Sequence, residues 1–194
     1  MYASFWQRFF ALVIDNIILS VASSIVGFII GLVIGGGMQA NANPTGEQLI
    51  IMIALYGIFF IAYCLYFPIL ESSASQATPG KMAVGIKVVD LNGQRISFLR
   101  ALGRYFAHAI SQITLLIGFM MVCFTEKKQA LHDMISGTLV VTNDYDPSNP
   151  PAPGPMETGD IVAIVFYVLY ILFIVAFILM MFAVGFAAAS NGKF

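Results

Sequence analysis

Two ionisable residues near the N-terminus are the first candidates for chemistry. Arg8 and Asp15 are seven residues apart, so on a helix they project from nearly the same face. Charged groups at membrane depth are costly and usually pair or face a polar interior. Asp15 is therefore expected to be neutral at pH 7 or to pair with a cation, Arg8 or Arg104. Either Asp15 titrates protons or attracts a cation, or it only bonds a neighbouring helix while Arg8 reaches the membrane surface.

A second group of candidates recurs at intervals of four residues. Arg100, Arg104 and His108 line one face of a predicted helix. This stripe can receive an anion or pair with Asp15 and Asp133. The alternative is anchoring of the helix at the membrane interface, which we favour for Arg100. A membrane-embedded histidine such as His108 is more often a hydrogen-bonded packing residue than a ligand.

The adjacent pair His132 and Asp133 raises the question of acid–base catalysis. The pair follows a predicted short basic helix, Glu126–Ala130. No serine or cysteine nucleophile stands at a recognisable spacing from it. Asp133 is expected instead to cap a helix or to pair with an arginine. The sequence predicts no catalytic residues, no metal site and no cofactor, and hence no enzyme.

Membrane segments must position these residues, as the composition shows. Of the 194 residues 59% are hydrophobic and only 10% are charged, whereas soluble domains have about 45–50% and about 25%. The formal net charge of -1 excludes a basic nucleic-acid-binding protein, so the expected partner is the lipid bilayer. Cys64 and Cys123 both lie in apolar stretches and are predicted to be buried free thiols.

Three apolar stretches are long enough to cross a bilayer, which takes about 20 residues. They run over Phe9–Gly36, Leu49–Leu70 and Ile161–Ala189. A fourth run, Ile113–Phe124, is short and typical of a re-entrant segment, and a full crossing would have to start near Tyr105. The predicted fold is an α-helical polytopic membrane protein with three to four membrane helices, one of them a candidate re-entrant segment.

The distribution of basic residues predicts the topology. Seven of the nine Lys and Arg residues fall between Lys81 and Lys128, and the Gln39–Gln48 connection has none. The positive-inside rule places the N-terminus and the basic region in the cytoplasm and the Gln39–Gln48 loop outside. With Ile113–Phe124 re-entrant, the C-terminus lies outside; with a full crossing, it returns to the cytoplasm.

A small cytoplasmic β-element is also predicted. The β-branched run Val84–Asp90 and the segment Arg95–Phe98 flank Asn92-Gly93, a pair typical of tight hairpin turns. Gly137–Thr142 is a further β-branched run. Because an isolated hairpin is marginally stable in water, Gly137–Thr142 is expected to pair with it as a third strand.

An abrupt change of composition predicts the domain organisation. Residues 143–159 form a proline-rich, acidic linker, which is expected to be extended and semi-rigid. They separate a membrane domain, residues 1–142, from an additional C-terminal transmembrane helix, residues 160–194.

Several motifs resemble the RDD family of bacterial integral membrane proteins. They cover about residues 5–142 and comprise Arg8…Asp15, Glu71-Ser72-Ser73, Gln76-Ala77-Thr78-Pro79-Gly80-Lys81, Gly85-Ile86-Lys87-Val88-Val89-Asp90, Arg100-Ala101…Gly103-Arg104-Tyr105 and Lys127-Lys128-Gln129-Ala130-Leu131-His132-Asp133. The resemblance implies that Arg8, Asp15 and Asp133 are the arginine and two aspartates that give the family its name. It also implies a bacterial protein, and transport of unknown ligands, with sodium/proton exchange proposed for some members.

Two functions are compatible with these residues. The first is a small multi-pass transporter or ion/proton exchanger of the bacterial inner membrane, with Arg8, Asp15, Arg104, His108 and Asp133 along the ligand or ion pathway. Three spans are few for such a path, which predicts a homo-oligomer. The alternative is a non-catalytic membrane scaffold, or an accessory subunit that binds other membrane proteins.

Overall fold

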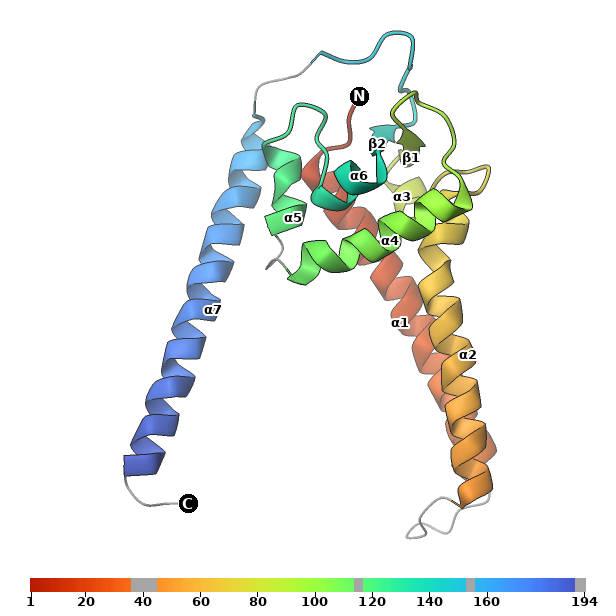
Figure 1. Ribbon diagram of the computed structural model, residues 1–194, viewed down its shortest axis with the longest axis vertical. Helices are drawn as coiled ribbons and strands as arrows, with labels where there is room; N and C mark the ends of the chain where they lie inside the picture. The colour runs from red at the N-terminus through yellow and green to blue at the C-terminus, as the bar shows by residue number, and fades with distance from the viewer. Residues whose placement is uncertain (36–44, 114–116, 153–155, 191–194) are drawn as a thin grey trace.

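Long apolar helices dominate the computed structural model, which describes residues 1–35, 45–113, 117–152 and 156–190 (Figure 1). Within these ranges three helices are long and apolar enough to cross a membrane: α1 (Phe5–Gly35), α2 (Gly46–Glu71) and α7 (Thr158–Ser190). They confirm the three predicted spans. Parts of the predicted Gln39–Gln48 loop and of the Ile113–Phe124 run fall outside the described ranges.

Capping residues determine where the first two long helices begin. The Ser4 hydroxyl accepts from the Gln7 backbone N–H at 3.3 Å, and the Gln7 side chain accepts from the Ser4 N–H at 3.0 Å. Thr45 and Gln48 make the same reciprocal pair at the start of α2. Such a capping box satisfies backbone donors that have no partner within the first helical turn.

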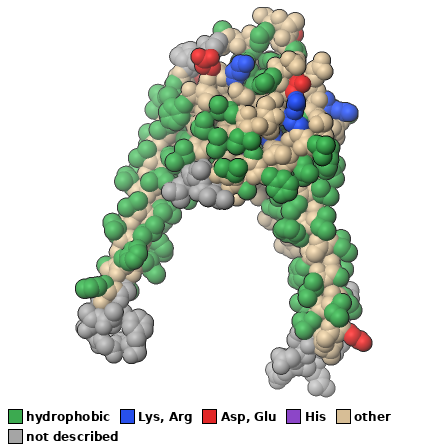
Figure 2. Space-filling view, viewed as in Figure 1, with side chains coloured by type: hydrophobic (Ala, Val, Ile, Leu, Met, Phe, Trp, Pro, Cys, Tyr) green, Lys and Arg blue, Asp and Glu red, His purple; other side chains and the backbone are tan. Residues whose placement is uncertain are grey.

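The molecule has the outline of an inverted V (Figure 1). Helices α1 and α2 form one leg and α7 forms the other. Hydrophobic side chains cover both legs, whereas lysine and arginine side chains gather where the legs meet (Figure 2). Residue 1 lies at that junction, and the last turn of α7 lies at the far end of its leg.

The junction contains the remaining short elements. We call residues 1–4 together with five elements the head: α3 (Pro79–Ala83), β1 (Ile86–Asp90), α4 (Phe98–Ile113), α6 (Leu131–Ser136) and β2 (Thr138–Thr142). A short helix α5 (Ile117–Met120) and a 3-10 turn η1 (Met121–Cys123) lie between α4 and α6 in the sequence. Helix α4 lies across the long helices rather than along them (Figure 1).

The sheet differs from the predicted hairpin. β1 pairs with β2 in antiparallel register, from Ile86 opposite Thr142 to Asp90 opposite Thr138. Asp90 does begin a turn, because its N–H donates to the Gln94 carbonyl at 2.8 Å. The chain then enters α4 instead of returning as a strand, since the Ser97 hydroxyl accepts from the Arg100 N–H at 3.3 Å. The predicted strand Arg95–Phe98 is therefore wrong.

The N-terminal segment lies along the outer edge of β2. Tyr2 forms a bridge with Val141, the Ala3 N–H donates to the Val140 carbonyl at 2.9 Å, and the Thr142 N–H donates to the Met1 carbonyl at 2.9 Å. Val140 and Val141 are both buried. The N-terminal segment thus binds two residues on the outer edge of β2, Val140 and Thr142. The predicted pairing of Gly137–Thr142 with the run Val84–Asp90 is confirmed by β1 and β2.

The predicted basic helix Glu126–Ala130 is also wrong. Residues 126 and 127 form a turn, residues 128–130 are irregular, and helix α6 begins one residue later, at Leu131. Asp133 explains this start, because its carboxylate accepts from the Ala130 N–H at 3.1 Å. Gly137 ends α6 in the left-handed conformation, with φ 62°, and leads directly into β2.

Candidate functional site

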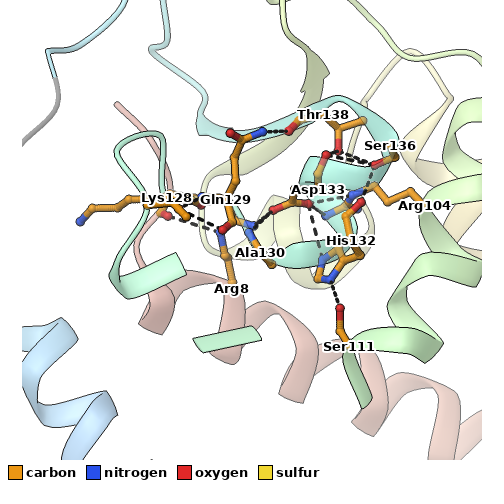
Figure 3. Close-up of polar contacts among 12 residues, drawn as sticks. Arg8, Arg104, Ser111, Lys128, Gln129, Ala130, His132, Asp133, Ser136 and Thr138 are labelled. Atoms are coloured by element: carbon orange, nitrogen blue, oxygen red, sulfur yellow. Dashed lines mark hydrogen bonds and ion pairs between the residues drawn. The ribbon is translucent and has the colours of Figure 1, made fainter. Parts of the chain in front are cut away.

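Five charged side chains meet inside the head in alternating order: Arg8, Asp133, Arg104, Glu71 and Lys81. We call them the ion-pair network. Each carboxylate oxygen of Asp133 binds one arginine. Oδ2 lies 2.5 Å from Arg8 Nη1, and Oδ1 lies 2.7 Å from Arg104 Nη2. Arg104 Nη1 also contacts Glu71 at 2.6 Å, and Glu71 in turn binds Lys81. Figure 3 shows Asp133 between the two arginines.

Each member of the network comes from a different helix. Arg8 lies in the first turns of α1, Glu71 at the end of α2, Lys81 in α3, Arg104 in α4 and Asp133 in α6. The network therefore joins the membrane helices α1 and α2 to three helices of the head. Its centre is buried: Asp133, Glu71 and Arg104 are 0%, 3% and 6% exposed. Arg8 and Lys81, at its two ends, are partly buried.

Further hydrogen bonds hold the network in place. Arg8 Nη2 donates to the Lys128 carbonyl at 2.5 Å, and Lys128 takes a positive φ of 47° at that point. Arg8 Nε donates to the Ala3 carbonyl at 3.4 Å. Within the described ranges, every buried side-chain nitrogen and oxygen has a hydrogen-bond partner. Arg8 is thus a fixed structural contact between the start of α1 and the head.

Burial and neighbouring charges shift the pKa values of Asp133 and Lys81 in opposite directions. Burial disfavours the ionised Asp133 carboxyl, but the positive charges of Arg8 and Arg104 outweigh it and hold its pKa well below the usual range. Burial lowers the pKa of Lys81 although the Glu71 carboxylate opposes that shift. Asp133 is therefore ionised at any physiological pH.

Asp15 occupies a separate site next to the network. Its carboxylate accepts from the Thr78 hydroxyl at 2.5 Å, the Gly80 N–H at 2.8 Å and the Tyr66 hydroxyl at 3.0 Å. Asp15 is 1% exposed. It therefore pins α1 to α2 and to the first turn of α3. The predicted pairing of Asp15 with Arg8 or Arg104 is wrong, because both arginines bind Asp133 instead.

The two histidine rings pack against each other beside the network, tilted by 54°. The ring centroids of His108 and His132 are 4.7 Å apart, and Phe119 packs against both rings. His132 Nδ1 lies 3.2 Å from the Ser111 hydroxyl, and its Nε2 lies 3.5 Å from Asp133. Burial lowers the pKa of His132 far below the ordinary histidine value. His132 is therefore a neutral packing residue at pH 7.

The structure thus brings Arg8, Arg104 and Asp133 together, with His108 next to them and Asp15 in a neighbouring site. We did not predict site roles for Glu71, Lys81, Tyr66, Thr78 and Gly80 from the sequence. The motif from Glu71 to Lys81 was the available signal, because four of these five residues lie in it. The described part of the chain contains no group of three His, Cys, Asp or Glu side chains that could hold a metal ion.

A second polar contact attaches α7 to the rest of the molecule. Lys128 Nζ lies 2.5 Å from Glu157 and 3.7 Å from Asp160, at the start of α7. The Trp6 indole N–H donates to the Gly159 carbonyl at 2.9 Å. Because Lys128 also binds Arg8 through its carbonyl, the first turn of α7 connects to the ion-pair network through one residue.

The long apolar helices, joined to the head by the ion-pair network, define an integral membrane protein. The RDD family model matches residues 2–137, a range that contains the whole ion-pair network and Asp15. The chain belongs to the RDD family. Helix α7 lies beyond the matched range.

Several curated relatives are similar to this chain. The chain is 41% identical over 146 residues to the uncharacterized protein YxaI of Bacillus subtilis (strain 168), a match that covers 72% of this chain and 96% of the relative. It is 29% identical to the uncharacterized membrane protein YteJ of the same organism, covering 72% and 80%. A Rickettsia prowazekii (strain Madrid E) relative, the uncharacterized protein RP437, is 32% identical over 49% of this chain and 53% of its own. No solved structure matches the chain.

Proposed function

We propose that this protein is a non-catalytic membrane scaffold of the bacterial inner membrane, with the head on the cytoplasmic side, that binds another membrane protein as an accessory subunit. The observation that carries the proposal is the ion-pair network. Its side chains come from five helices and bind one another. These ion pairs hold the head in a fixed position relative to helices α1 and α2.

Helix α7 supplies the surface for the partner. Its contacts with the rest of the chain involve the first turns, where Asp160 and Ala163 are buried. Beyond them the side chains are largely exposed, with Phe173 67% and Phe182 74% exposed. Helices associate within lipid mainly by close packing, so an apolar helix that stands apart from its own chain is suited to pack against a helix of another protein.

Photo-crosslinking tests this role with a matched pair of positions. Phe173 in α7 and Phe60 in α2 are both 67% exposed. Each is replaced in turn by a photoreactive phenylalanine derivative, and the full chain is crosslinked in intact membranes. We expect a discrete adduct with a second protein from position 173 and lipid adducts alone from position 60. Lipid adducts alone from position 173, or an adduct only with a second copy of this chain, would contradict the accessory role.

We propose proton-coupled ion exchange as a second candidate function, which one observation favours. The Asp15 carboxylate lies inside a membrane helix and is bound by two hydroxyl groups and one backbone N–H. Ionisable groups at this depth commonly mark ion or proton pathways.

Flux measurements in proteoliposomes test this candidate. With an imposed sodium or proton gradient, Asp15→Asn is expected to lose the flux that the wild type shows above empty vesicles. Glu47→Gln serves as the control, because Glu47 is an exposed acid in the first turn of α2. Wild-type flux equal to that of empty vesicles would rule out exchange of these ions, and equal losses in both variants would exclude a specific role for Asp15.

A further inference from the structure

Helix α4 has two sharply different faces. One face carries Ala101, Arg104 and Ser111, which are buried. The other face carries Leu99, Phe106 and Ile110, which are 76%, 63% and 48% exposed. The spacing of these three residues, seven and then four, places them in one stripe along a helix.

The polar contacts fix how α4 is turned. Arg104 binds Asp133 of α6, and Ser111 contacts His132, which also lies in α6. The buried face of α4 therefore points into the head. In Figure 1, α6 lies on one side of α4 and the long helices extend towards the other side. Leu99, Phe106 and Ile110 lie on the face of α4 opposite to Arg104 and Ser111, so we infer that this stripe faces the side of the long helices.

This orientation places an apolar stripe where the bilayer begins. Helices α1, α2 and α7 extend from the head as apolar legs (Figures 1 and 2). Hiding one large apolar side chain from water contributes about 1.5–3 kcal/mol. A stripe of three such side chains next to membrane helices is therefore stabilised by contact with lipid rather than with water.

The basic residues at the start of α4 fit the same placement. Arg95 is exposed, and the Arg100 side chain is 46% exposed with its carboxylate partner Asp90 3.7 Å away. Arginine side chains at the edge of an apolar face can extend to the phosphates of the lipid headgroups. Helix α4 and residues 117–123 meet at an angle of 113°. Together they therefore do not form one straight helix across the membrane.

We propose that α4 is an interfacial membrane helix that binds the phospholipid surface. It lies in the plane of the bilayer, with Leu99, Phe106 and Ile110 at the boundary between headgroups and acyl chains and with Arg95 and Arg100 at the headgroups. The same helix carries Arg104 on its opposite face. One face of α4 therefore binds lipid, and the opposite face binds the ion-pair network through Arg104.

Site-directed spin labelling in phospholipid vesicles tests this placement. Single cysteines at 99, 106 and 110 carry a nitroxide in the full chain, with Cys64 and Cys123 replaced by alanine. Accessibility to oxygen and to a water-soluble nickel complex gives the depth of each label, and Leu91 in the exposed turn is the aqueous control. We expect all three labels at similar depth, buried by about 5–10 Å.

The distance between the outer labels makes the result decisive. Positions 99 and 110 are separated by about 16 Å along the helix axis, so a crossing helix would show a depth difference of about that size. Such a difference would overturn the proposal. So would nickel access equal to that at Leu91, or shielding from both reagents, which would indicate that protein covers the face. Leu99→Trp and Ile110→Trp, quenched by brominated acyl chains with the native cysteines retained, provide a second depth measurement.

Discussion

Replacing Asp133 with asparagine is expected to lower the free energy of unfolding by about 3–5 kcal/mol, because it leaves two buried arginines without their shared anion. Asp133 is 0% exposed and contacts both Arg8 and Arg104. The variant also weakens the start of α6, since the carboxylate accepts from the Ala130 N–H. The unfolding midpoint in detergent micelles and the amount of chain in the membrane measure the effect.

An exposed aspartate provides the control for this substitution. Asp144 has a side chain that is 74% exposed, and Asp144→Asn is expected to change stability by less than about 0.5 kcal/mol. Combining Arg8→Gln with Asp133→Asn should cost less than the sum of the two single substitutions, because the two residues share one contact. Equal stability of Asp133→Asn and Asp144→Asn would show that the network does not support the fold.

The long helices could be predicted from the sequence because each is specified locally. A run of about 20 apolar residues is sufficient to indicate a span, and α1, α2 and α7 all begin within about four residues of their predicted starts. The role of Asp133 was also foreseen in outline. It caps α6 and pairs with arginine, and both contacts follow from the chemistry of a carboxylate near a helix start.

The network itself depends on contacts that the sequence does not display. Arg8 and Asp133 are separated by 125 positions, and Arg104 and Glu71 by 33. Neither spacing has a helical or strand period, so only the folded head shows which cation meets which anion. Glu71 and Lys81 were missed for this reason, and Asp15 was assigned the arginines that Asp133 binds.

The incorrect prediction of the second hairpin strand, Arg95–Phe98, has a similar physical cause. Asn92-Gly93 does form a turn, but Ser97 then caps α4 and removes the following residues from the sheet. The actual partner of β1 is β2, about fifty residues further along the chain. Local turn chemistry therefore predicted the turn correctly and the strand pairing incorrectly, because pairing is determined by which segments the helices bring together.

Replacing Gly80 with alanine is expected to lower the free energy of unfolding by about 3 kcal/mol, at the upper end of overpacking effects. A Cβ atom at this position would lie 2.1 Å from the Ala11 carbonyl oxygen and 2.8 Å from the Asp15 carboxyl carbon. The nearest obstacle is backbone and cannot rotate away. Helices α1 and α3 must therefore separate, which also strains the hydrogen bond from the Gly80 N–H to Asp15.

Gly103 provides a matched control, because it is also a helical glycine and a Cβ atom there meets nothing within 4 Å. Gly103→Ala is expected to leave stability unchanged or to raise it by up to about 1 kcal/mol, through the better helix propensity of alanine. The unfolding midpoints of both variants in the same detergent make the comparison. If Gly80→Ala unfolds at the same midpoint as Gly103→Ala, the close approach of α1 and α3 at Asp15 does not contribute to the stability of the protein.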